Sequence, residues 1–302
     1  MGAVAANAAV ESVVIASARG QSPTGAAWRR LWASPVARVG LAIVCIFVLL
    51  SVVPPVVHHY DAATDSDLTG RLRAPMSGHP FGTDSLGRDI LVRVVHATRV
   101  SLGLGVSSVV VAAVVGSLLG LIAGYVGRRV DLVLMFCMDI LLAFPGTLLA
   151  IAIVAMIGPG LRNSLLAIST VAIPIYARIA RGAVLELREL EFVTAARGLG
   201  GTGPHVVMRH IFPNTLPPLI VQTTLAIAFA ILEAAALGFL GLGAQPPTPE
   251  WGAMLADSYK YFTSGAWWVF FFPGAAIMLS VLGFNLLGDG LRDALDPRLR
   301  AD

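Results

Sequence analysis

The chain has very few charged residues and a single lysine. Only 13% of its 302 residues are charged, 56% are hydrophobic, and the mean hydropathy is +0.79. Because soluble domains carry roughly 25% charged residues, this composition excludes a soluble globule. Lys260 is the only lysine, and the arginines that give the formal net charge of +3 are scattered between apolar runs. We therefore expect a protein that lies in membrane lipid and binds no nucleic acid.

Residues that would build a covalent, metal or nucleotide site are also scarce. The two cysteines, Cys45 and Cys137, both fall inside apolar runs, so we expect no disulfide framework. The six histidines lack the ligand spacing of a zinc site, and we expect no bound metal. The sequence contains no GxxxxGK[ST] loop for nucleotide phosphates and no nucleophile–base constellation. The expected protein is not an enzyme and binds no cofactor itself.

Six long apolar runs predict an all-α membrane protein with six transmembrane helices, because a helix needs about 20 residues to cross roughly 30 Å of hydrocarbon. The third run is expected to cross despite Asp139 and Pro145, and the fourth is short in its uncharged part. The expected spans are residues 39–57, 100–127, 132–157, 161–180, 216–240 and 268–288. Small residues would let these helices approach closely, namely Gly103, Gly105, Gly116, Gly120 and Gly124.

The distribution of basic residues sets the orientation. Arginine and lysine near the ends of spans resist translocation across the membrane. If the N-terminus is inside, fourteen of the 21 basic residues are cytoplasmic. Five of the other seven lie in the long segment after the first span, where the rule is weak. We therefore expect both termini to be cytoplasmic.

The chain divides into four segments. We expect a disordered cytoplasmic tail that ends in an interfacial stretch at 28–32, then the first span with an extracytoplasmic segment, a core of five helices, and a second cytoplasmic tail. Their bounds are residues 1–30, 31–98, 99–290 and 291–302. Within the second segment, residues 85–99 place Ile90, Val94 and Ala97 near one stripe, which predicts a separate interfacial helix before the second span.

The loop between the fourth and fifth spans, residues 181–214, contains an amphipathic pattern. Val184, Leu187, Leu190 and Thr194 recur at helical spacing and predict one apolar stripe on a short helix, with Val193 and Arg197 beside it. Such a stripe fits a groove on a partner protein, and it fits the headgroup region of membrane lipid equally well. The pattern alone leaves both interpretations open.

A cluster of glycines predicts a bend in this loop. Gly198, Gly200 and Gly201 are expected to end the first helix, because glycine adopts the left-handed conformation without a Cβ penalty. Pro204 is suited to the first position of a second helix. The loop is therefore expected to form a bent helix pair.

These residues resemble the EAA motif of the inner-membrane permease subunits of bacterial ABC importers, of the dipeptide, oligopeptide and nickel type. In that motif two alanines are followed by a glycine four positions later and by a proline thirteen residues after the glycine. Ala195, Ala196, Gly200 and Pro213 match this spacing. Thr194 stands where the motif has its glutamate, and the nearest carboxylate is Glu191.

Three further stretches resemble the same family: "FGTDSLGRDILVR" at 81–93, "LGFLGLGAQPPTPEWGAML" at 237–255 and "FNLLGDGLRDALDPRLR" at 284–300. The "GTDSLGRD" element resembles the C-type member of the usual B-type and C-type permease pair. The resemblance implies a type I ABC importer permease fold, with a cytoplasmic coupling-helix loop between the fourth and fifth transmembrane helices.

The resemblance also implies a function and a set of partners. The chain would form half of the translocation path for di- or oligopeptides in the bacterial inner membrane, with nickel or another small solute as the alternative cargo. The implied partners are a B-type permease, an extracytoplasmic substrate-binding protein and two ATPase subunits that hold ATP and Mg²⁺. Contact with the ATPases is expected at Glu191, Thr194, Ala195, Ala196, Arg197, Gly198, Leu199, Gly200 and Gly201, with Pro213 and Asn214 at the loop's end.

Three residues inside the spans are candidates for the translocation path: Asp139, Pro145 and Glu233. A carboxylate in hydrocarbon costs about 2.5–3.5 kcal/mol on insertion scales and usually faces a cavity or a partner. Either carboxylate could instead pair within the helix bundle. A secondary transporter without ATPases would need inverted repeats and midplane carboxylates for a coupling ion, and neither pattern is evident.

Overall fold

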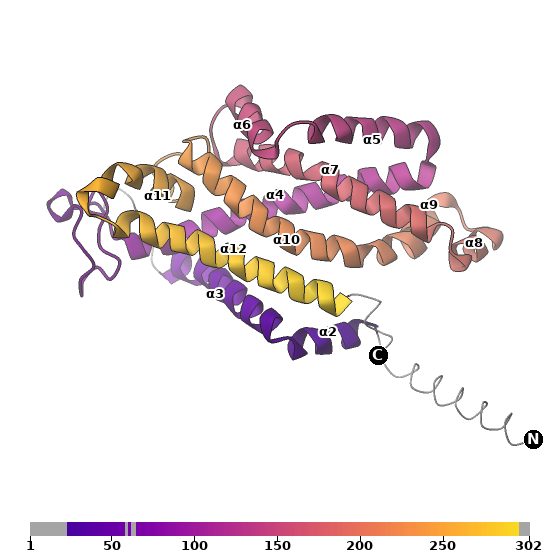
Figure 1. The fold of residues 1–302 in the computed structure, drawn as a ribbon, viewed down its shortest axis with the longest axis horizontal. Coiled ribbons are helices and arrows are strands. Elements are labelled where there is room, and N and C mark those ends of the chain that lie inside the picture. Colours follow the sequence, from indigo (N-terminus) through magenta and orange to yellow (C-terminus); the bar gives the residue numbers. More distant parts are fainter. Residues whose placement is uncertain (1–22, 58–59, 62–64, 296–302) are drawn as a thin grey trace, which may run out of the picture.

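In the computed structural model, which describes residues 23–57, 60–61 and 65–295, long helices run side by side in one bundle (Figure 1). The helices are α2 (Pro23–Ala33), α3 (Pro35–Val57), η1 (Leu68–Gly70), α4 (Ile90–Val126), α5 (Arg128–Leu142), α6 (Gly146–Ile157), α7 (Leu161–Leu187), α8 (Glu191–Gly198), α9 (Gly203–Val206), η2 (Val207–Ile211), α10 (Phe212–Phe239), α11 (Trp251–Ser258), η3 (Tyr259–Ser264) and α12 (Trp268–Leu295). Within the described part of the chain, β-pairing is limited to two isolated bridges, Met76 with His79 and Thr83 with Asp89. The all-α class expected from the sequence is therefore confirmed.

Among the residues that the structure describes, five helices are long and apolar enough to cross a membrane, and a bent pair of helices raises the number to six. The third expected span, 132–157, is not one straight helix, because α5 and α6 meet at an angle of 91°. The break lies at Pro145, which has an extended ψ of 128°. Proline lacks the backbone N–H that would continue the helix and disfavours helical geometry at the residue before it. The fourth expected span, in contrast, is a continuous helix of 27 residues.

The second span begins earlier than the sequence pattern suggested. The expected interfacial helix at 85–99 is wrong, because residues from Ile90 onward form the first turns of the 37-residue helix α4. Asp89 caps this helix, with its side chain accepting a hydrogen bond from the backbone N–H of Val92 at 3.0 Å. No glycine or proline separates Ile90 from Val100, so nothing in that stretch interrupts the helix.

The two expected tails are only partly within the described residues. Helix α2 takes in residues 23–30, so the last part of the first tail is helical rather than disordered. Residues 1–22 lie outside the described residues, as do residues 296–302 of the second tail. In α2, the rings of Trp28 and Trp32 pack edge to face with their centroids 5.8 Å apart.

Glycines on α4 let it pack directly against the backbone of α7, and the two helices run in the same direction (Figure 1). A Cβ atom on Gly116 would lie 2.5 Å from the carbonyl oxygen of Ile173, and one on Gly120 would overlap the carbonyl of Ala177. Gly105 meets α10 instead, where a Cβ would lie 2.8 Å from Ile231. Gly103 has open space around it, so it mediates no helix contact among the described residues of this chain.

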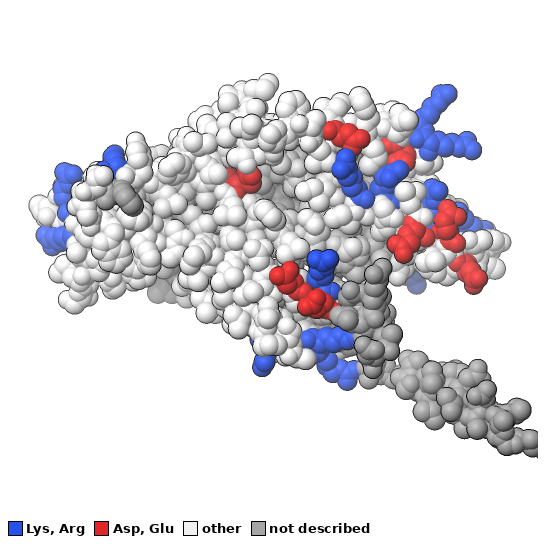
Figure 2. Space-filling model, in the orientation of Figure 1, with Lys and Arg blue, Asp and Glu red and all other residues white. Residues whose placement is uncertain are grey.

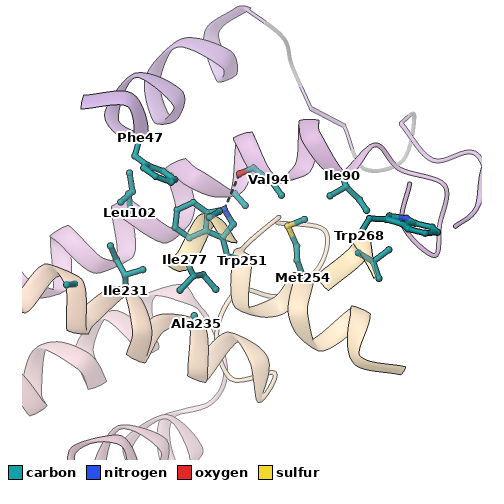
Figure 3. Packing of buried hydrophobic residues seen from close by; sticks show 14 of the residues in the cluster. Phe47, Ile90, Val94, Leu102, Ile231, Ala235, Trp251, Met254, Trp268 and Ile277 are labelled. Atoms are coloured by element: carbon teal, nitrogen blue, oxygen red, sulfur yellow. Dashed lines mark hydrogen bonds between the residues drawn. The ribbon is translucent and has the colours of Figure 1, made fainter. Parts of the chain in front are cut away.

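At the opposite end from α8, the short helix α11 is fixed to α4 by buried polar contacts. Glu250 is 1% exposed, and its carboxylate accepts hydrogen bonds from the backbone N–H groups of Gly252 and Ala253 and from the hydroxyl of Ser101. Burial raises the pKa of Glu250, and these three hydrogen bonds oppose that rise. Beside it, Trp251 donates its indole N–H to the carbonyl of Val94 at 3.1 Å (Figure 3).

The "GTDSLGRD" stretch folds around one buried carboxylate at the same end. Asp84 is paired with Arg88 at 2.7 Å and with Arg93 at 2.5 Å, and all three residues are buried. Asp84 also accepts hydrogen bonds from the backbone N–H groups of Leu86 and Arg88. A buried charge with so many donors is stable where it would be costly alone.

We predict that Gly120→Ala lowers the stability of the chain by about 1–3 kcal/mol, because the added methyl group forces α4 away from the α7 backbone. The matched change Gly103→Ala, on the same helix but facing open space, is expected to be neutral or stabilising by up to about 1 kcal/mol. Thermal unfolding of the purified variants in detergent measures both effects. Equal melting temperatures for the two variants would contradict the packing role of Gly120.

Candidate docking loop and polar cavity

Helix α8 lies beyond the end of α7, at one end of the bundle (Figure 1). A turn at residues 188–190 joins the two helices, and Leu190 takes an extended conformation before α8 begins. In this turn, the guanidinium of Arg188 donates a hydrogen bond to the carbonyl of Gly124 at 3.1 Å and pairs with Glu189 at 2.9 Å. The turn is therefore tied to the end of α4 as well as to α7.

The far end of α8 stops in a Schellman motif at Gly200. The backbone N–H of Gly201 bonds to the carbonyl of Ala196, and that of Gly200 bonds to the carbonyl of Arg197, both at 3.0 Å. Gly200 has a φ of +88°, the left-handed region that other residues rarely adopt. Gly198 is the last helical residue and has no positive φ, so only Gly200 of the three glycines carries the bend by its conformation.

The underside of α8 is anchored in a small apolar cluster. Val193 is fully buried, and it belongs to a cluster with Leu121 of α4, Val184 of α7, Val206 of α9 and Ile211 of η2. Tyr125 of α4 packs against this cluster, and its ring faces the guanidinium of Arg197 at 5.3 Å. These contacts fix the loop to the ends of two long helices.

The apolar stripe expected from the sequence is partly wrong. Val184 and Leu187 belong to α7 and face the cluster, but the helix breaks at residues 188–190, which changes the phase of everything that follows. Val193 is consequently the buried residue of α8, whereas Leu190 and Thr194 are exposed. No glycine or proline marks the break, so the sequence pattern by itself extends one period of 3.6 residues across it.

The exposed side of α8 carries both apolar and charged residues. Leu199 is 90% exposed at the tip of the bend, and Phe192 of α8 and Met208 of η2 are also exposed. Glu191, Thr194, Ala195 and Arg197 of the expected contact set are also exposed. Charged side chains of both signs gather at this end of the molecule, while the long middle is almost free of charge (Figure 2).

The chain returns to the bundle through a distorted helix. Pro204 lies in the first turn of α9, as expected, and η2 then forms a π-helical turn closed by the bond from the N–H of Phe212 to the carbonyl of Val207. Pro213 and Asn214, the expected loop end, lie in the first turn of α10. Asn214 donates its side-chain amide to the carbonyl of His210 at 2.7 Å.

Two ion pairs join α5 to α7. Arg181 holds both carboxylate oxygens of Asp131, at 2.5 and 2.7 Å. Nearer the middle of α7, Arg178 pairs with Asp139 at 2.6 Å, and both side chains are more than half exposed. The partner of Asp139 is thus an arginine of the same chain, and the pair leaves much of the carboxylate accessible.

Glu233 lines a cavity of about 200 Å³ between α4, α6, α7 and α10. One of its carboxylate oxygens accepts a hydrogen bond from the hydroxyl of Thr147 at 2.7 Å, and the other is buried without a partner. Pro145 begins the bend that brings α6, with Thr147, to this place. Gln222 lines both this cavity and a larger hollow of about 660 Å³ nearer α8.

Sequence reasoning missed Thr147, Gln222 and Arg178. Gln222 and Glu233 are 11 residues apart, which is close to three helical turns, so their shared face of α10 was detectable from spacing. Thr147 and Arg178 carry no such signal, because their partners are 86 and 39 residues away. Among the described residues, no group of three or more His, Cys, Asp and Glu side chains is arranged to hold a metal ion.

Residues 116–301 match the binding-protein-dependent transport system inner membrane component family, and residues 22–75 match the N-terminal TM domain of oligopeptide transport permease C. The dipeptide transport system permease protein DppC of Alkalihalophilus pseudofirmus is 50% identical over 93% of this chain and 91% of its own length. The di/tripeptide transport system permease protein DppC of Pseudomonas aeruginosa is 46% identical, over 92% and 93%. The glutathione transport system permease protein GsiD of Pectobacterium atrosepticum is 43% identical, over 91% of each chain.

Among solved structures, the chain is similar to the MetNI methionine ABC transporter in an inward-facing conformation. The TM-score is 0.54 at 20% identity, and the match covers 68% of this chain and 98% of the other. At this identity the likeness shows the fold alone. It agrees with the importer permease fold that the sequence motifs implied.

We predict that Val193→Ala loosens α8 by about 1–3 kcal/mol, because it removes two buried methyl groups from the anchoring cluster. The neighbouring change Thr194→Ala acts on an exposed side chain and is expected to stay within about 0.5 kcal/mol. Hydrogen–deuterium exchange of residues 191–206 measures the local opening. Similar exchange in both variants would show that Val193 does not anchor the helix.

Proposed function

This chain belongs to the family of binding-protein-dependent transport system inner membrane components, and from that premise we propose that it forms half of the translocation path of an ATP-driven peptide importer. The other half would come from a second permease of the B type. Two ATPase subunits and an extracytoplasmic binding protein would complete the assembly. The observation that carries this proposal is the hairpin formed by α8 and α9, called the α8 hairpin, which packs on the apolar cluster with one side and exposes the other.

Peptides are the cargo that the relatives support. The three relatives described above are named for transport of dipeptides, di- and tripeptides, and glutathione, and each match covers at least nine tenths of both chains. None of these three is named for a metal. We therefore propose short peptides as the cargo of this chain, in place of nickel.

The exposed side of α8 is suited to bind in a groove on an ATPase subunit. Leu199 and Phe192 offer apolar side chains, and Ala195 lets a partner surface approach closely. The side chain of Leu199 is 90% exposed, and covering it with a partner surface would remove its apolar area from water, which is favourable. Charged rim residues such as Glu191 and Arg197 would set the register of the contact.

The anchoring cluster explains how a push on α8 would reach the membrane. Val193 contacts a cluster whose other members come from α4, α7 and the segment that enters α10. A rigid displacement of α8 therefore moves three long helices together. In this scheme, ATP binding closes the two ATPases and opens the path outward, and hydrolysis resets it.

We propose that the α8 end faces the cytoplasm of a bacterium and that the α11 end faces outward. Helix α2, the start of α5 and α8 lie at the same end of the bundle (Figure 1). That end holds Arg29, Arg30, Arg128 and Arg129, and basic residues are retained on the cytoplasmic side. The two ends of the described chain lie there too, which supports cytoplasmic termini.

We predict that Gly200→Val abolishes peptide uptake while the variant still inserts into the membrane. A β-branched residue at a φ of +88° costs about 1–3 kcal/mol. We therefore expect the Schellman bend to rearrange, which changes the angle between α8 and α9. Gly198→Ala is the matched control, because both glycines have open space around the missing Cβ and only Gly200 has a positive φ. Uptake of radiolabelled Ala-Ala by the assembled importer, normalised to membrane content, measures the effect. Normal uptake by the Gly200→Val importer would refute the coupling role.

We also predict that Leu199→Asp reduces co-purification of the ATPase subunits at least about tenfold, since a central apolar contact of an interface contributes about 2 kcal/mol or more. Leu199→Met keeps an apolar side chain of similar size and is expected to retain the ATPases. Quantitative pull-down from detergent extracts with the tagged permease gives the comparison. Undiminished ATPase recovery with the aspartate variant would place the docking contact elsewhere.

A further inference from the structure

One face of α10 carries polar side chains through the apolar part of the bundle. Gln222 and Glu233 lie 11 residues apart, close to three turns and about 17 Å along the helix axis. Both line the cavity of about 200 Å³, and Gln222 also lines the larger hollow, together with Asn214, Glu186 and Arg292. Gln222 therefore borders both hollows, and Glu233 stands three turns away on the same polar face.

The carboxylate of Glu233 is only half satisfied by the protein. Thr147 donates one hydrogen bond to Oε1, and Oε2 is buried without any partner. A buried carboxylate oxygen without a donor is costly, more so at membrane depth. Within the described residues, no Arg, Lys or His lines the cavity, so this chain does not supply the missing cation there.

The chemistry of the cavity selects one class of ligand. A carboxylate oxygen without a donor binds a group that brings positive charge and N–H donors, which in a peptide is an ammonium group. The remaining wall is apolar, from residues such as Ile168, Val171 and Phe229, with the amide of Gln222 as a second polar contact. Since a cavity of about 150 Å³ holds benzene, this one has room for about one residue of a peptide.

We propose that Glu233 binds the ammonium group of the peptide cargo in this cavity, with Gln222 as the next polar contact along α10. This inference rests on the proposed transport function and names the part of the cargo that the path recognises. The ammonium can come from the free amino end of a peptide or from a lysine side chain. A purely structural bond that pins α6 to α10 is the competing role for the Thr147–Glu233 pair.

Two variants of the assembled importer separate these roles. Glu233→Gln removes the charge but keeps an acceptor for Thr147, and we expect uptake of Ala-Ala to fall about tenfold or more. Thr147→Val removes the bond between α6 and α10 but keeps the carboxylate, and we expect a loss of less than about threefold. Equal uptake by Glu233→Gln and the unmodified importer overturns the proposal, as does an equal loss in both variants.

A second measurement does not depend on transport. The purified full-length chain, alone or in its complex, is treated with dicyclohexylcarbodiimide, and modification of Glu233 is quantified by mass spectrometry with three added probes. Ala-Ala is expected to protect Glu233, N-acetyl-Ala-Ala to give no protection, and N-acetyl-Ala-Lys to protect only if a side-chain ammonium also binds. Equal protection by all three probes, or by none, overturns the proposal. If the unmodified importer takes up no peptide, the proposed function fails and this labelling experiment alone decides whether the ammonium site exists.

Discussion

The direct contact between α4 and α7 is the constraint on which the rest of the structure depends. Lipid provides no hydrophobic drive for helix association, so helices in a membrane hold together where their backbones approach closely. Gly116, Gly120 and Gly124 provide that approach at intervals of one turn. The seam continues into the loop, because a Cβ on Gly124 would meet Val184, and Val184 packs in the cluster that holds Val193 of α8. The contacts that pack α4 against α7 therefore continue into the contacts that position α8.

The separation of charge along the molecule follows from the same environment. Charged groups that lie between the two ends are few: Asp139 is paired with Arg178, and Glu233 lines a cavity. At the α11 end, Asp84 and Glu250 are buried but surrounded by donors, so they fix the loops without a free charge. At the α8 end, charges are exposed and available for contact with a soluble surface (Figure 2).

The membrane-spanning helices could be predicted from the sequence because hydropathy reports directly on exposure to lipid. The bend at Gly200 could be predicted because its left-handed backbone conformation favours glycine. Pro145 signals the break, but its size does not follow from the sequence, because a proline inside a span also fits a small kink and the chain turns there by 91°. The turn at 188–190 carries no such signal, and one helical period across it places Leu190 and Thr194 on the apolar stripe although both are exposed. Pairings such as Arg178 with Asp139 join residues 39 positions apart, and no local pattern encodes them.

The π-helical turn at Val207–Ile211 has a geometric consequence for how the two ends of the fifth span relate. A π-turn holds one residue more than an α-turn, which rotates everything beyond it by about 100° around the helix axis. The one extra residue in the π-turn therefore sets which side of α10 faces the cavities relative to the α8 hairpin. Deletion of one residue between Gly200 and Gln222 would therefore rotate α10 and turn its polar face away from the hollows.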